Sequence, residues 1–148
     1  MSKVGIINKD GKVQVIHPAP GFTVEDVAKK ANIDLKEVKE MDISKLPKDR
    51  KFRNAWESTA TTVKENLAKS KEIHLERLRE KRNKKLDELD KEEIKFMGQG
   101  KEVELAEVRA EKQRLRDLPD TIKLTARKVA DLPAIWDDAL DSHEAYEE

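Results

Sequence analysis

Residues 62–118 read TVKENLAKSKEIHLERLREKRNKKLDELDKEEIKFMGQGKEVELAEVRAEKQRLRDL, and this stretch decides the fold. The part before residue 98 contains neither Gly nor Pro. Its apolar residues recur at spacings built from three and four, which places them on one face of a helix: Leu75, Leu78, Leu86, Leu89 and Phe96. We therefore expect a long amphipathic helix over about 62–97, which would measure roughly 50 Å.

The triplet Gly98-Gln99-Gly100 interrupts this pattern, because glycine weakens a helix and accepts the left-handed conformation that often ends one. A second apolar stripe follows, which predicts a helix over about 101–117: Leu105, Val108, Leu115 and Leu118. The short connection predicts an antiparallel helical hairpin. The second helix covers only about half of the first, so the head, the C-terminal segment or another copy of the chain must cover the remainder.

The N-terminal segment predicts a small β-rich head. Residues 3–17 form two β-branched runs around Asp10-Gly11, a pair typical of a tight hairpin turn. Thr23 is suited to cap a short helix that ends near Asn32. We expect a third short strand within 34–41, because two strands alone are marginal in water.

Residues 44–57 contain apolar residues at helical spacing after Asp49, a possible helix cap. This pattern predicts a short helix that carries Phe52 and Trp56 and packs on the sheet. Beyond the hairpin, Pro119 is expected to end the second helix, and Leu132 to Trp136 to form a short helix or anchor. The last twelve residues contain six acidic side chains and no Lys or Arg, so we expect them to be solvated unless a basic surface receives them.

These patterns together predict an α+β, mostly α fold in three segments. The first is a small α+β head with a β-hairpin or three-stranded sheet and short helices (1–60). A coiled-coil-like helical hairpin follows (61–118), and a C-terminal anchor segment and acidic tail complete the chain (119–148). A narrow seam of this kind usually finds its cover by oligomerisation, so we expect a homo-oligomer.

The composition argues against several kinds of function. Basic and acidic side chains number 31 each, so the chain lacks the positive excess typical of nucleic-acid or membrane-surface binders. There is no Cys, no apolar run long enough for a membrane span or signal peptide, and no phosphate-binding or nucleophile motif. The three histidines lack metal-ligand spacing, and His74 is expected to be packed or solvated. We therefore expect a soluble non-enzyme with no cofactor and no metal.

One local run of charge keeps a nucleic-acid alternative open. Residues 77–85 contain six basic side chains and one acidic side chain. They could read nucleic acid or form a solvated helix face. No aromatic residue interleaves to stack on bases, and carboxylates flank the run, so both observations favour the solvated face.

Two blocks carry a resemblance to a known group of proteins. Residues 46–57, LPKDRKFRNAWE, and residues 110–119, AEKQRLRDLP, resemble segments of small proteins encoded beside tail genes in tailed bacteriophages and prophages. The second block is also similar to the C-terminal part of tail-fibre assembly proteins. The Pro-Ala-Pro-Gly sequence at residues 18–21 is similar to a turn in the same group.

The resemblance implies a structural or connector protein of the phage tail that binds other tail or fibre proteins. The first alternative is a transient tail-fibre assembly chaperone that is not retained in the virion, and the second, less favoured, is a nucleic-acid-binding regulator. The resemblance implies a location in the host cytoplasm during assembly, and in the virion if the protein is retained. The candidate protein-binding residues are Phe52, Trp56, Leu75, Leu78, Leu86, Leu89 and Trp136, of which Phe52 and Trp56 could equally be core residues.

Overall fold

The computed structural model describes residues 2–147, and the chain divides into two compact units, Met1–Ser70 and Lys71–Glu148. The architecture is α+β and mostly α, as the sequence predicts: strands occur in the first unit and the two long helices follow. The division falls inside the first of these helices, α2 (Leu67–Gln99). The expected hairpin and C-terminal segments therefore share the second unit from residue 71 onward.

The first unit contains a three-stranded antiparallel sheet in the order β2-β1-β3. Strands β1 (Lys3–Lys9) and β2 (Lys12–Ile16) form the expected hairpin, in which Asp10 and Gly11 have φ of 52° and 74°. These are the values that a tight turn between antiparallel strands requires. The expected third strand is confirmed as β3 (Lys39–Asp42), which pairs with the first half of β1.

Helix α1 (Val24–Lys30) packs on one face of this sheet at Gly5. The predicted cap is confirmed: Thr23 and Asp26 form a capping box through hydrogen bonds of 2.9 and 3.1 Å. Asn32 follows the helix with φ of 58°. A Cβ on Gly5 would lie 2.7 Å from a Val24 methyl group, so the close packing of helix on sheet requires glycine at this position.

The helix predicted over residues 44–57 is wrong. The region contains only single 3₁₀ turns, Ile43–Lys45 and Arg53–Ala55, and Trp56 begins a strand. Strand β4 (Trp56–Ser58) pairs with β5 (Val63–Glu65) in a second, two-stranded sheet. The hydroxyl of Thr59 accepts a hydrogen bond from the Thr62 amide at 3.0 Å within the connecting turn. Residues 62–66 are therefore strand and cap rather than helix.

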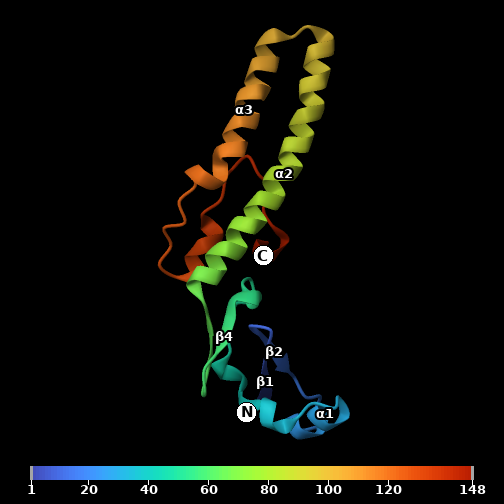
Figure 1. Cartoon of the computed structure of the whole chain (residues 1–148), viewed down its shortest axis with the longest axis vertical. Coiled ribbons are helices and arrows are strands. Elements are labelled where there is room, and N and C mark those ends of the chain that lie inside the picture. Colours follow the sequence, from blue (N-terminus) through green and yellow to red (C-terminus); the bar gives the residue numbers. More distant parts are fainter. Residues whose placement is uncertain (1, 148) are drawn as a thin grey trace. The chain divides into compact units, whose positions relative to one another are not determined.

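Helix α2 begins where Asn66 caps it, since the Asn66 side chain accepts a hydrogen bond from the Lys69 amide at 2.9 Å. It ends at Gln99, and Gly100 adopts φ of 65° in the turn to α3 (Glu102–Thr121). Figure 1 shows the two helices side by side and antiparallel, which confirms the predicted hairpin. Pro119 does not end α3, because a proline in the last turn sacrifices only one helical hydrogen bond and the Ile122 amide still reaches Leu118 O at 2.8 Å.

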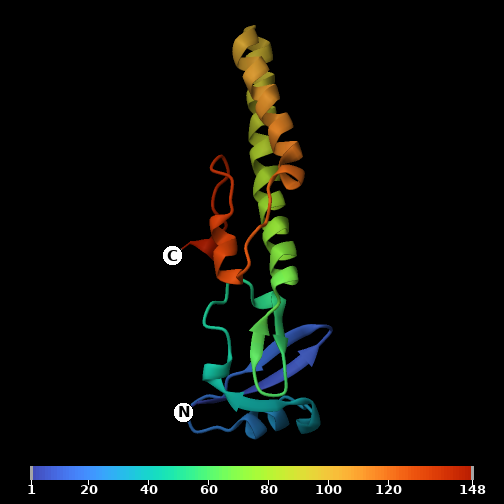
Figure 2. The ribbon, with the colours of Figure 1, turned by 90° about the vertical axis from the view of Figure 1, so that its left-hand side faces the viewer.

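The C-terminal strap, residues 123–147, contains two 3₁₀ segments, Val129–Ala134 and Glu144–Tyr146. It runs back along the part of α2 that α3 does not reach (Figure 2). The chain itself therefore covers the half of the stripe that the sequence leaves without a partner. The expectation of a homo-oligomer rests on that uncovered half, so it loses its basis.

Candidate protein-binding site

Two of the predicted binding residues lie in the core of the first unit. Trp56 is 1% exposed and packs in a cluster with strand residues of both sheets and with Leu46, which follows a 3₁₀ turn; the strand residues are Val4, Ile6, Val13, Met41 and Val63. Phe52 is also 1% exposed. The structure gives both side chains a packing role inside the head, which is the alternative that the sequence leaves open.

The other predicted residues form one apolar cluster in the second unit. The leucine seam of α2 comprises Leu75, Leu78, Leu86 and Leu89, of which Leu78 and Leu89 are buried and the other two half-buried. The seam meets Val108, Leu115 and Leu118 of α3, and Leu140 and the half-buried Trp136 of the strap. The predicted helix phase is therefore confirmed, and both α3 and the strap contribute to its cover.

His74 is the buried centre of the contact between α2 and the strap. Its side chain is 0% exposed, its Nε2 lies 2.6 Å from the carbonyl oxygen of Ile135, and its Nδ1 lies 2.7 Å from the Tyr146 hydroxyl. The rings of Trp136 and Tyr146 flank the imidazole, with centroids at 5.4 and 5.3 Å. Arg77 donates a hydrogen bond to the same hydroxyl at 3.1 Å and lies over the tyrosine ring.

Burial sets the protonation of this group of side chains. Desolvation lowers the pKa of His74, and the charge of Arg77 lowers it further, against a hydrogen bond to Ile135 that raises it. Desolvation likewise raises the pKa of Tyr146. Both side chains are therefore held in their neutral forms, which suits a structural contact.

An ion pair also attaches the strap to α3. The Arg114 guanidinium contacts both carboxylate oxygens of Asp137, at 2.7 and 3.2 Å, and pairs with Glu111 on its own helix. The hydrogen bond from Arg114 lowers the pKa of Asp137. The acidic C-terminal region thus contacts Arg114, Arg77 and His74 of the hairpin, which is the exception that the sequence allows to a solvated tail.

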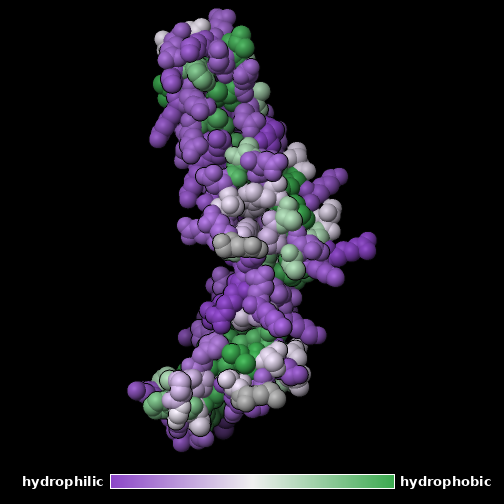
Figure 3. Space-filling model, turned by 180° about the vertical axis from the view of Figure 1, so that it is seen from behind, coloured by the Kyte–Doolittle hydropathy of each residue, from purple (hydrophilic) through white to green (hydrophobic). Residues whose placement is uncertain are grey.

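In the first unit three large apolar side chains are exposed: Phe22, Leu35 and Ile43. In the second unit, the exposed large apolar side chains lie at the turn end of the hairpin. We call it the tip: Ile94 and Met97 on α2 and Val103 on α3, which are 70%, 55% and 69% exposed. Figure 3 shows hydrophobic atoms among the hydrophilic ones at this end of the unit. None of these three residues was among the predicted binding residues, which on α2 were taken from the apolar stripe that packs inside the hairpin. The sequence feature that could have indicated their exposure is their position out of phase with that stripe, near Gly98 and Gly100.

The basic run at residues 77–85 is partly neutralised by its own helix. Arg79 pairs with Glu76 at 3.7 Å, and Lys85 with Glu88 at 3.6 Å. Arg77 is engaged with Tyr146, as described above. These contacts leave the run closer to a charge-balanced helix face than to a groove for a nucleic-acid backbone.

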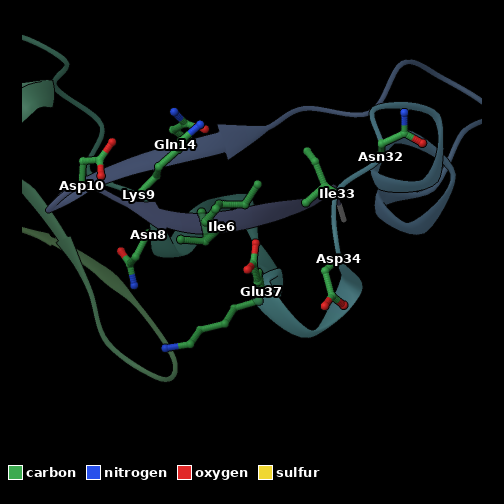
Figure 4. Close-up of a pocket in the computed structure, with 11 residues that line it drawn as sticks. Ile6, Asn8, Lys9, Asp10, Gln14, Asn32, Ile33, Asp34 and Glu37 are labelled. Carbon is green, nitrogen blue, oxygen red and sulfur yellow. The ribbon is translucent and has the colours of Figure 1, made fainter.

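The first unit contains a hollow of about 830 Å³ beside β1 (Figure 4). Its lining mixes apolar side chains such as Ile6 and Ile33 with charged ones such as Asp34 and Glu37. Asp34 accepts a hydrogen bond from the Lys36 amide and so serves the local turn. Across residues 2–147 no group of three His, Cys, Asp or Glu side chains is arranged to hold a metal ion. No helix in that range has the length and apolar character needed to cross a bilayer.

Comparisons with known proteins add no relative: no family model matches the chain, and neither do curated proteins or solved structures. The resemblance to phage tail-region proteins therefore rests on the sequence alone, at residues 18–21, 46–57 and 110–119.

Proposed function

We propose that this chain is a structural or connector protein of a bacteriophage tail, which acts by binding other tail or fibre proteins through the tip of its hairpin. One observation carries the choice of surface: the leucine seam is covered by the chain itself, whereas Ile94, Met97 and Val103 are left exposed. The blocks at residues 46–57 and 110–119 supply the phage context.

The tip has the character of an interaction surface. Ile94 and Met97 lie three positions apart on α2 and so share one face of the helix. Neighbouring exposed apolar side chains are typical of protein-binding sites, whereas single ones are ordinary surface. The surrounding positions are charged, as in the polar rim of an interface: Lys91, Lys95 and Glu102. Three anchors make a small contact, so the partner must supply a pocket or add contacts elsewhere.

The test replaces the three apolar tip residues by serine and measures binding to the tail and fibre proteins encoded beside this chain. All three side chains are exposed, so we expect the helical circular dichroism to stay unchanged while the affinity falls at least tenfold. The matched control replaces Lys91, Lys95 and Glu102 by serine at the same end of the hairpin, and it should bind like the original protein. Equal binding by both triple variants would place the docking surface elsewhere.

A transient tail-fibre assembly chaperone is the second candidate, and the same exposed tip favours it, because a chaperone must offer apolar surface when free. Mass spectrometry of finished particles separates the two. A connector is present at a fixed copy number, and a chaperone is missing. If the chain binds a tail protein but is absent from finished particles, the chaperone function is the correct one.

A further inference from the structure

Two imidazole rings lie where the C-terminal strap meets α2, one on the helix and one in the strap, and both use Nδ1 as a hydrogen-bond acceptor. His74 on α2 receives the Tyr146 hydroxyl at 2.7 Å, and His143 within the strap receives the Ala145 amide at 3.1 Å. The chain has three histidines, and these two lie next to the same tyrosine: the ring centroids are 5.3 and 5.9 Å from that of Tyr146.

The geometry fixes the proton on each ring. His74 Nε2 lies 2.6 Å from a carbonyl oxygen, which can only accept, so Nε2 carries the hydrogen and Nδ1 is bare. The Tyr146 hydroxyl must then donate to Nδ1, while its oxygen accepts from Arg77. At His143 an amide N–H points at Nδ1, so that nitrogen is bare as well.

Protonation reverses the role of Nδ1 at both places. On His74 an added hydrogen would displace the hydroxyl hydrogen of Tyr146 from its acceptor, inside a side-chain cluster that excludes water. On His143 it would oppose the Ala145 N–H that begins the last 3₁₀ turn. At His74 the Tyr146 hydroxyl hydrogen thereby loses its acceptor at the contact between α2 and the strap. At His143 the bond that is lost lies within the strap, in the turn that presents Tyr146 to His74.

We propose that His74 and His143 form a proton-operated latch, which holds the strap on α2 at neutral pH and releases it in mildly acidic solution, so that Leu75 and Leu78 become uncovered. The latch lies at the other end of the hairpin from the tip and does not depend on the proposed partner.

The charged groups around the latch favour the neutral rings. Arg77 faces both histidines, and Lys81 faces His143, so these cations oppose a further positive charge. Glu80, 3.8 Å from His143 Nε2, and Glu144 act in the opposite direction. Desolvation is the largest cause at both rings, and the resulting pKa of each lies below 6.5.

The sign of the pH dependence follows. In the released strap both rings meet water and take up protons near pH 6.5, whereas the bound rings resist. The two rings therefore stabilise the bound strap fully above pH 6.5, and this stabilisation decreases as the pH falls below 6.5. The carboxylate of Asp137 stays ionised in this window because its pKa lies below 3.8.

The experiment measures hydrogen exchange by mass spectrometry on the full chain at pH 7.5 and 5.0, with rates divided by intrinsic rates at each pH. We expect peptides from residues 128–147 to lose at least tenfold protection at pH 5.0, while those of 102–116 keep theirs. In the double variant His74→Gln and His143→Asn, whose amides bond without titrating, strap protection should not change with pH. The control His17→Asn alters the histidine of the first unit and should behave like the original chain.

Three results would overturn the latch. The first is strap protection in the original chain that is equal at both pH values. The second is a pH response that persists in the double variant, which would point to carboxylates. The third applies if the double variant releases its strap already at pH 7.5. The His74 ring protons of the original chain are then titrated by nuclear magnetic resonance, and a midpoint at or above pH 6.5 contradicts the proposal.

Discussion

The two halves of the helical hairpin unit bury the same leucine seam by different means. In the half next to the turn, α3 covers α2 helix on helix, and Lys112 joins the helices through contacts with Asp90 at 2.6 Å and Glu93 at 3.4 Å. In the other half, an irregular strap covers the helix through aromatic rings and a buried histidine. One apolar stripe thus accepts a regular cover and an irregular one.

The difference concerns what each cover needs. A helix satisfies its own backbone hydrogen bonds, so α3 needs to contribute only side chains. The strap bonds its own backbone only in short turns, so other backbone groups need side-chain partners, as the Ile135 carbonyl finds at His74. The irregular cover therefore brings polar, titratable groups to the seam, and we expect it to be the less stable half.

The largest effect should come from Leu78→Asp. Leu78 is 1% exposed in the seam, and an unpaired carboxylate there should destabilise the second unit by several kcal/mol. The measurement is urea unfolding followed by the helical circular dichroism signal. The control is Glu76→Ala, which alters an exposed residue two positions earlier. It should change the free energy of unfolding by no more than about 0.5 kcal/mol. Similar losses in both variants would show that the helix phase is wrong.

An intermediate effect is expected from Leu132→Ala in the strap. Leu132 is 0% exposed, and truncation of a buried leucine costs about 2–4 kcal/mol. If the strap opens separately, hydrogen exchange should accelerate over residues 123–147 and remain slow over 102–116. Leu124→Ala, at a half-buried position of the same strap, should have a smaller effect. Equal acceleration in the strap and in α3 would show that the two halves fold as one cooperative unit.

The smallest effect should come from Arg114→Gln, which removes the ion pair between α3 and the strap. Arg114 is 44% exposed and Asp137 15%, so solvent screens the pair and the loss should be about 0.5–1 kcal/mol. Urea unfolding should show this loss at low salt and a smaller one at about 1 M salt, where screening is short-ranged. Arg116→Gln on the same helix is the control. A loss that salt leaves unchanged would indicate packing by the arginine stem rather than charge.

Local patterns were sufficient to predict most regular elements. The turn at Asp10-Gly11, the cap at Thr23 and the phase of the seam each depend on neighbouring residues, and the structure confirms them. Trp56 shows where this fails, because its helical spacing from Phe52 competes with strand pairing to residues 63–65, which only the folded chain reveals. Tertiary pairing overrode the local spacing there.

The cover of the seam could not be predicted for a related reason. Nothing in residues 123–147 has a period that matches α2, since an irregular segment packs through single residues such as Leu132 and Tyr146. The acidic composition of the segment suggested solvation, yet Asp137 finds Arg114 and the aromatic rings find His74. The tip was missed because exposure depends on where the turn falls relative to the stripe.

The distance along the sequence between His74 and its partner Tyr146 has a consequence during synthesis. Tyr146 follows His74 by 72 residues, so at about 5–20 residues per second the ribosome adds the tyrosine roughly 4–14 s after the histidine. Throughout that interval the nascent helix carries Leu75 and Leu78 without the strap that will cover them. A newly made chain therefore exposes a site for misassociation here until the strap is complete, and slowed translation of residues 123–146 would lengthen that interval.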